Sequence, residues 1–198
     1  MADTYKTISN PGEGIYKEKM SKFLSFAHYA ASAADAKEII KKYQKEYFDA
    51  RHVCWAYMVG AARTEFLSSD NGEPSGTAGK PILGQINSFG LTDVVVVVVR
   101  YFGGIKLGTS GLIVAYREAA AEALRAAGIE ERHVLEFVEF TFPYLAMNDV
   151  MKLVKGSEVK VEEQVFDNSC RMRLSVRADY VGDLRRRLDD IEGVTFCG

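Results

Sequence analysis

The chain has 198 residues, 47% of them hydrophobic and 26% charged, and its formal net charge is −2. This composition excludes a disordered chain, which would be less apolar, and a fibrous one, which would be richer in glycine and proline. The charge also excludes a protein that is basic throughout, because residues 1–133 carry a net charge of +1 and residues 134–198 one of −3. A nucleic-acid site in this chain must therefore be a local basic patch.

The sequence contains no segment typical of a membrane or secreted protein. Its longest apolar run, residues 94–99, is far shorter than the roughly 20 residues that cross a bilayer. Its first residues lack a basic stretch leading into an apolar core. The cysteines Cys54, Cys170 and Cys197 are odd in number and lack metal-ligand spacing, as is typical of reduced thiols. We therefore expect a cytoplasmic protein without a metal or cofactor.

The first expected elements are two short strands, residues 5–8 and 15–19, which form a pair through a turn at residues 10–12. A capping box of Ser32 and Asp35 then predicts a helix, because apolar positions recur at helical spacing after it. By the same criteria, further strands are expected at residues 53–59 and 64–67 and a short helix at residues 82–89.

Residues 91–100 form the clearest expected element, because they include six consecutive valines. A strand that is apolar on both faces is typical of the centre of a sheet covered from both sides. A glycine-rich turn follows at residues 101–111, and then an alanine-rich helix at residues 112–127 that stops at Gly128. The first part of the chain is therefore expected to be an α/β domain.

After residue 133 the pattern changes to six short elements. They are a strand at residues 134–142, a helix at 143–155, strands at 158–166 and 170–177 joined by a hairpin turn at 167–169, a helix at 179–191 and a strand at 194–197. This βαββαβ order is that of a ferredoxin-like domain. We therefore predict an α+β protein of two domains, residues 1–130 and 131–198.

The first candidate site is the polar stretch at residues 70–81, Asp-Asn-Gly-Glu-Pro-Ser-Gly-Thr-Ala-Gly-Lys-Pro. Its three glycines allow the backbone to expose N–H groups that hold an anion. Asp70 and Glu73 are alternatively suited to acid–base chemistry or to binding a hard cation. A loop of turn-forming residues without any site is a third interpretation.

The second candidate site is the strand-to-helix junction at residues 100–111. Thr109 and Ser110 stand where a new helix presents unpaired N–H groups and the positive end of its dipole, and Lys106 adds a charge. Phosphate is the natural ligand of such a junction. The spacing fits neither a Walker A loop nor the GxGxxG pattern. Alternatively, Thr109 or Ser110 simply caps the helix.

Two weaker candidates complete the set. His52 and Cys54 share a face of the expected strand, as in a Cys–His nucleophile pair, but no third group that orients them is apparent. On the last two helices, five basic residues form a possible patch for a phosphate backbone: Lys152, Lys155, Arg185, Arg186 and Arg187. Because aspartates interleave with them, a solvated face of mixed charge is favoured.

Together these segments resemble the signature of the IMPACT family. The resemblance rests on residues 70–79, on the valine strand and on residues 100–108, Arg-Tyr-Phe-Gly-Gly-Ile-Lys-Leu-Gly. Residues 51–57 are also similar, with Val53 where the family more usually has Asn, and Lys19, Ser21, Lys22 and Phe23 match its early basic–Ser–Lys–Phe stretch. The resemblance covers residues 5–128 well. The remainder is similar in layout to the small carboxy-terminal domain of the bacterial, YigZ-like branch.

The resemblance implies a fold for each domain. The first would resemble the second domain of the fifth small-subunit ribosomal protein, with its uncommon left-handed βαβ crossover. Domain four of elongation factor G and the sugar- and mevalonate-type kinases share that fold. The second domain would resemble domain five of elongation factor G. Eukaryotic relatives regulate translation by binding the activator of the starvation-responsive initiation-factor kinase, a system that bacteria lack.

We therefore expect a non-enzymatic, cytoplasmic binding protein of the translation apparatus that contacts RNA phosphates or a translation-related protein. The expected anion- or nucleic-acid-binding residues are Ser75, Gly76, Thr77, Gly79, Lys80, Arg100, Gly103, Gly104, Lys106, Gly108, Thr109, Ser110 and Gly111. No membrane partner is expected, and the oligomeric state stays open.

One alternative is an enzyme that acts on a phosphorylated small molecule, or a hydrolase that uses His52, Asp70 and Glu73. It requires these side chains and the turn at residues 108–111 to line one pocket. Another is a protein-interaction module whose docking face is the ferredoxin-like sheet.

Overall fold

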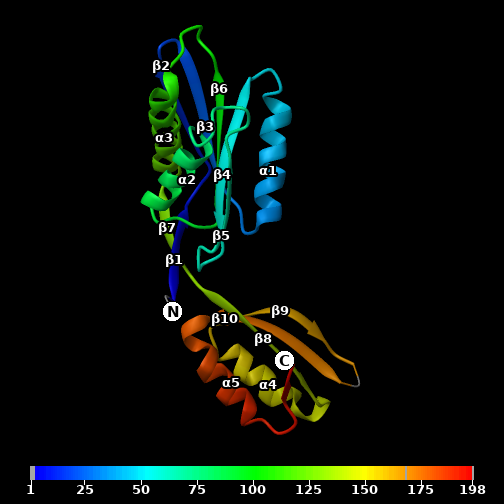
Figure 1. The fold of residues 1–198 in the computed structure, drawn as a ribbon. Helices are drawn as coiled ribbons and strands as arrows, with labels where there is room; N and C mark the ends of the chain where they lie inside the picture. The colour runs from blue at the N-terminus through cyan, green and yellow to red at the C-terminus, as the bar shows by residue number, and fades with distance from the viewer. Residues whose placement is uncertain (1–2, 168, 198) are drawn as a thin grey trace. The chain divides into compact units, whose positions relative to one another are not determined.

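The computed structural model describes residues 3–167 and 169–197, which divide into two compact units. Residues 5–132 form the first unit, and residues 133–197 with residues 3 and 4 belong to the second (Figure 1). In the described ranges, no helix is both long and apolar enough to cross a lipid bilayer.

The first unit is built on a five-stranded antiparallel sheet. In spatial order its strands are β2 (Gly12–Glu18), β3 (Ser21–Tyr29), β6 (Val94–Tyr101), β4 (His52–Val59) and β5 (Glu65–Ser69). The valine strand, β6, is the middle one, and all six of its valines are fully buried. The prediction of a central strand covered on both faces is confirmed.

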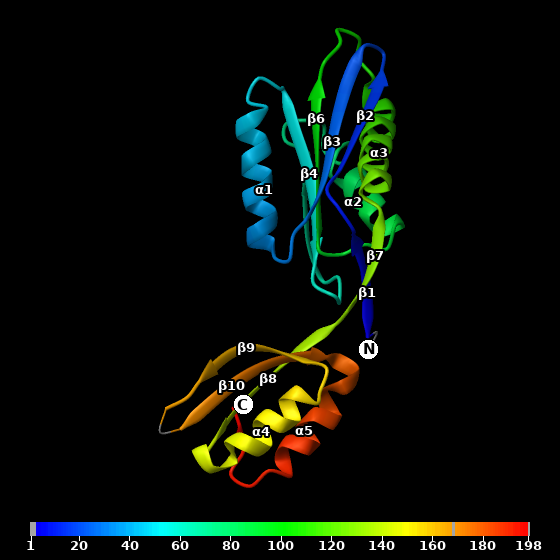
Figure 2. The same cartoon turned by 180° about the vertical axis from the view of Figure 1, so that it is seen from behind.

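Helices cover both faces of this sheet. Figures 1 and 2 show α1 (Ala33–Glu46) on one face and α2 (Gly79–Ser88) with α3 (Gly108–Ala127) on the other. The valines of β6 alternate between the two layers: Val95, Val97 and Val99 belong to the core under α1, whereas Val94, Val96 and Val98 belong to the core under α2 and α3. The predicted cap of α1 is confirmed, because the Ser32 side chain accepts a hydrogen bond from the Asp35 N–H at 3.1 Å.

The expected pairing of the first two strands is wrong. β1 (Thr4–Ile8) pairs with β7 (Ile129–His133) in a separate two-stranded sheet, and β2 pairs with β3 through a tight turn at Lys19 and Met20. The local pattern identifies a strand but does not name its partner. β3 itself was not predicted, because it buries residues on both faces and therefore lacks a clean alternation.

The second unit has the predicted order of strands and helices. Its elements are β8 (Leu135–Phe142), α4 (Met147–Lys155), β9 (Val159–Val165), β10 (Cys170–Arg177), α5 (Val181–Asp189) and β11 (Thr195–Phe196), with short 3-10 turns at Tyr144–Ala146 and Ala178–Tyr180. The sheet order is β11-β8-β10-β9. Asn168, in the expected hairpin turn between β9 and β10, lies outside the described residues.

The basic residues on α4 and α5 lie among acidic ones. Arg186 and Arg187 both form ion pairs with Asp183, and Arg185 stacks over the Phe196 ring. Lys152 borders a hollow that Asp149, Asp190 and Glu192 also line. The favoured interpretation, a face of mixed charge, therefore matches the structure.

Candidate functional site

The polar loop that connects β5 to α2 folds around its own carboxylate. Asp70 accepts hydrogen bonds from the backbone N–H groups of Gly76, Ala78 and Gly79 at 2.8, 3.0 and 2.8 Å. Burial opposes ionisation of this carboxyl, but the three hydrogen bonds outweigh it and lower the pKa of Asp70 below its ordinary value. The N–H groups expected to hold an external anion are therefore occupied by a side chain of the same loop.

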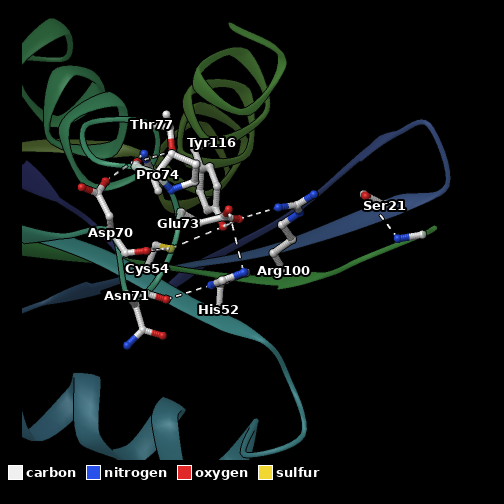
Figure 3. Close-up of polar contacts among 12 residues, drawn as sticks. Ser21, His52, Cys54, Asp70, Asn71, Glu73, Pro74, Thr77, Arg100 and Tyr116 are labelled. Atoms are coloured by element: carbon white, nitrogen blue, oxygen red, sulfur yellow. Dashed lines mark hydrogen bonds and ion pairs between the residues drawn. The ribbon is translucent and has the colours of Figure 1, made fainter. Parts of the chain in front are cut away.

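A cluster of buried polar side chains connects this loop to β6 and α3 (Figure 3). The Glu73 carboxylate forms an ion pair with Arg100, whose Nη1 lies 2.6 Å from Glu73 Oε1. The Tyr116 hydroxyl, from the middle of α3, donates a hydrogen bond to the same oxygen at 2.8 Å. Only 3% of the Glu73 side chain and 8% of the Arg100 side chain are exposed. The pair thus joins the β5–α2 loop, β6 and α3 in the interior of the unit.

Cys54 belongs to the same cluster, where its thiol is buried and hydrogen-bonded. Its Sγ lies 2.9 Å from the Asp70 carbonyl oxygen and 3.3 Å from the Tyr116 hydroxyl. Burial raises the pKa of the Cys54 thiol to about 12, so the thiolate that attacks an electrophile does not form near neutral pH. The structure therefore gives no support to the weaker hypothesis of a Cys–His nucleophile pair and matches a structural role for this cysteine.

His52 has a defined orientation at the edge of this cluster. Its Nδ1 lies 2.8 Å from the Asn71 carbonyl oxygen. Because a carbonyl only accepts, Nδ1 carries a proton and donates it. This leaves Nε2, 3.8 Å from Glu73 Oε2, as the ring nitrogen that faces the carboxylate.

A cavity of about 430 Å³ opens beside His52 and Glu73. Its polar lining residues are Arg51, His52, Glu73, Arg100, Lys106 and Thr109. Its apolar walls come from Pro74, Phe102, Leu107 and Leu112. Residues from β4, the β5–α2 loop, β6 and the start of α3 therefore meet in one hollow of the first unit.

The start of α3 forms one wall of this cavity. The helix begins at Gly108, four residues earlier than predicted, and Gly108 has a φ of 75° that suits glycine. Its N-cap residue is Leu107, whose side chain makes no capping hydrogen bond. Neither Thr109 nor Ser110 is therefore the cap, and the first N–H groups of α3 are not satisfied by a capping side chain.

The structure separates the expected binding residues into two groups. Arg100, Lys106, Gly108 and Thr109 line the cavity. The others lie outside its lining. Ser75, Gly76, Thr77, Gly79 and Lys80 belong to the Asp70 loop and the start of α2, and Gly103 and Gly104 to the turn after β6. Ser110 and Gly111 line a separate hollow with Tyr16 and Lys19.

Gly103 shows why some of these residues have a structural role. Its N–H donates to the Ser21 hydroxyl at 3.2 Å, and a Cβ at this position would come within 2.0 Å of the Met20 backbone. The glycine lets the turn after β6 approach the β2–β3 turn closely.

The spatial condition of the enzyme hypothesis is met in part. His52 and Glu73 share the cavity with Gly108 and Thr109, whereas Asp70 does not line it. Across the described residues, no group of three or more His, Cys, Asp or Glu side chains is arranged to hold a metal ion.

The sequence did not single out Tyr116, although this side chain fixes the Glu73 carboxylate. One signal was available: Leu112 and Tyr116 are four residues apart on the alanine-rich helix and therefore share a face. A hydroxyl on a face that is otherwise apolar needs a buried partner. Which partner it finds depends on the tertiary structure.

The fold and the cavity define an α+β protein whose first unit carries a partly cationic cavity at a helix N-terminus. Comparison with known proteins places it in a family: the model of the Impact N-terminal domain matches residues 19–124, and the chain belongs to the IMPACT family. It is 34% identical to the IMPACT family member YvyE of Bacillus subtilis over 82% of this chain and 75% of that one. It is 32% identical to YigZ of Escherichia coli over 87% and 85% of the two chains.

A solved structure supports the whole fold. A crystal structure described as that of a hypothetical protein is 28% identical, covers all of this chain and 98% of its own, and superimposes with a TM-score of 0.82.

Proposed function

We propose that this protein binds RNA phosphates as a component of the translation apparatus in the cytoplasm, and that the cavity beside His52 and Glu73 is its phosphate site. The observation that carries the proposal is the convergence of Arg51, Arg100 and Lys106 with the uncapped start of α3 on one hollow. Cationic side chains and free helix N–H groups are the donors that phosphate prefers.

The charge of the cavity supports an anionic ligand. Among its lining residues in the described part of the chain, three are permanently cationic and only Glu73 is acidic, so the lining carries a net charge of +2 when His52 is neutral. Lys106 is exposed and free to reach a ligand, whereas Arg100 is fixed by Glu73. This local excess of positive charge is the basic patch that a chain of net charge −2 requires for contact with RNA.

Family membership supports the translational context. The family resemblance implies eukaryotic relatives that regulate translation. We propose that the two units share the folds that the resemblance implies: that of the second domain of the fifth small-subunit ribosomal protein, and that of domain five of elongation factor G. The unpaired cysteines Cys54, Cys170 and Cys197 fit a reducing compartment.

A second candidate function is an enzyme that acts on a phosphorylated small molecule. It is favoured by one observation: His52 Nε2 faces Glu73 inside the cavity where the phosphate would lie. A histidine whose ring nitrogen faces a carboxylate at a ligand cavity has the position of a general base. The alternative requires turnover of a phosphorylated compound that His52→Ala abolishes.

Binding of single-stranded RNA across a salt series tests the leading proposal. We expect the affinity to fall as salt rises, and Lys106→Ala to weaken binding and reduce the slope of log K against log salt by about one. Two matched controls, Lys45→Ala on α1 and Lys80→Ala at the start of α2, remove a lysine outside the cavity lining and should leave binding unchanged. Absent binding, or equal loss in all three variants, would contradict the proposal.

If RNA is not bound directly, a pull-down tests the remaining hypothesis, that the protein is a protein-interaction module. A partner retained by this chain after nuclease treatment would favour a protein-interaction module. A partner that is lost after nuclease treatment would indicate that RNA mediates the contact.

A further inference from the structure

We propose that the cavity recognises a terminal phosphate on a nucleotide, a phosphomonoester, rather than the phosphodiesters inside an RNA strand. The inference rests on the proposed function and specifies its ligand. It is argued from the size of the cavity, its charge, one unsatisfied donor and the ring at its wall.

The volume of the cavity suits a small ligand. Sites for small molecules have volumes of about 300 to 1,000 Å³, and this cavity, at about 430 Å³, lies near the lower end of that range. A cavity of this volume suits a ligand of small-molecule size, such as a single nucleotide, rather than a long stretch of strand.

The charge of the lining matches a phosphomonoester. A phosphate with a free end carries a charge of about −1.5 to −2 at neutral pH, because its second pKa is near 6. A phosphodiester carries one negative charge per phosphate. The net charge of +2 from Arg51, Arg100, Lys106 and Glu73 is thus complementary to the terminal group.

One buried donor of this cavity has no partner. Arg100 is only 6% exposed, and its Nε makes no hydrogen bond within the described residues, although its Nη1 binds Glu73. An unsatisfied buried donor costs free energy, and a ligand oxygen is one way to satisfy it. Together with Lys106 and the first N–H groups of α3, Arg100 offers several donors to a group with three free oxygens.

The ring of Phe102 provides a place for a base. Phe102 lines the cavity and is 47% exposed, and the Arg100 guanidinium lies 5.6 Å from the centre of its ring. Bases stack on exposed aromatic rings without a strong sequence preference. Pro74, Leu107 and Leu112 add apolar surface for the rest of the nucleotide.

The experiment compares ligands that have a terminal phosphate with ligands that lack one. The full chain is titrated with a labelled RNA hexamer bearing a 5′-phosphate, a 3′-phosphate or hydroxyls at both ends. It is also titrated with adenosine 5′-monophosphate and its 3′,5′-cyclic phosphodiester. We expect a phosphorylated end to tighten binding about tenfold, as expected for added charge-assisted hydrogen bonds, and the monophosphate to bind better than the cyclic ester.

Two pairs of variants test the residues. Lys106→Ala should remove the preference for a phosphorylated end and Lys45→Ala should keep it. Phe102→Leu should weaken nucleotide binding, whereas Phe66→Leu, which changes a similarly exposed ring on β5, should not.

The outcomes separate this inference from the proposed function. Hexamers that bind equally with and without a terminal phosphate, and that all lose affinity in Lys106→Ala, would overturn the inference and leave RNA binding standing. A free monophosphate that binds as tightly as the phosphorylated hexamer supports the terminal-phosphate site but makes a free nucleotide, not RNA, its source. Absence of binding by every ligand would overturn both.

Discussion

Replacing Glu73 by alanine should destabilise the first unit strongly. The substitution leaves the Arg100 guanidinium buried without its ion-pair partner at 2.6 Å and removes the acceptor of the Tyr116 hydroxyl at 2.8 Å. Breaking a buried pair on one side costs about 3–5 kcal/mol, because an uncompensated charge remains in the interior. We expect a loss of this size in the free energy of unfolding.

Urea unfolding followed by tryptophan fluorescence measures this loss. The chain has one tryptophan, Trp55 on β4, so the signal reports on the first unit. For a urea dependence of about 2 kcal/mol per molar, a loss of about 4 kcal/mol shifts the midpoint by about 2 M. The matched control is Glu38→Ala, whose exposed ion pair with Lys41 should contribute less than about 1 kcal/mol.

Glu73→Gln separates the charge of this side chain from its hydrogen bonds. The amide oxygen still accepts from Arg100 and Tyr116, so the loss should be smaller than for alanine. Removing the carboxylate also makes the cavity more positive, so added phosphate should stabilise Glu73→Gln more than the parent chain. If Glu73→Ala unfolds at the midpoint of the parent chain, the Glu73–Arg100 pair does not stabilise the fold and this reasoning is refuted.

Three further predictions concern Tyr116, Asp70 and the cysteines. Tyr116→Phe should lower the free energy of unfolding by about 1.5–3 kcal/mol in the same fluorescence assay, the value of a hydrogen bond to a charged group such as Glu73, and an unchanged midpoint would contradict this role. The pKa of Asp70 lies below its ordinary value of 3.8, so its carboxylate stabilises the fold above pH 3.8, and this contribution is lost as the pH falls through the lowered pKa. Asp70→Asn should therefore lower the free energy of unfolding by about 1.5–3 kcal/mol at pH 7, and by progressively less below pH 3.8. Iodoacetamide at pH 8 should alkylate the partly exposed Cys197 but not Cys54, whose pKa of about 12 and burial protect it; mass spectrometry that finds Cys54 labelled in the folded chain would refute this.

The local sequence pattern predicted most elements because each carries its own periodicity or cap. The valine run identified β6, the Ser32 cap identified the start of α1, and the second unit followed its predicted βαββαβ order. The pairing of β1 with β7 could not be predicted, because these strands are more than 120 residues apart and each is too short to specify a partner.

The candidate site shows the same division. The glycine-rich junction drew attention to Arg100, Lys106, Gly108 and Thr109, which share the cavity. The Asp70 loop has the same glycine-rich composition, yet its N–H groups bind Asp70. Composition shows that a backbone can form an anion nest, but whether a side chain of the loop already fills it depends on the three-dimensional path of the chain.

The sequence by itself therefore determined the family signature, the near-neutral charge that demands a local site, and most of the helices and strands. Only the tertiary structure decided that Glu73, Arg100 and Tyr116 meet in one buried cluster, and that the start of α3 and Lys106 face the same cavity. Local pattern reflects interactions between residues a few positions apart. The cluster joins side chains 27 and 43 residues apart, whose approach is fixed by packing of the sheet between its helices.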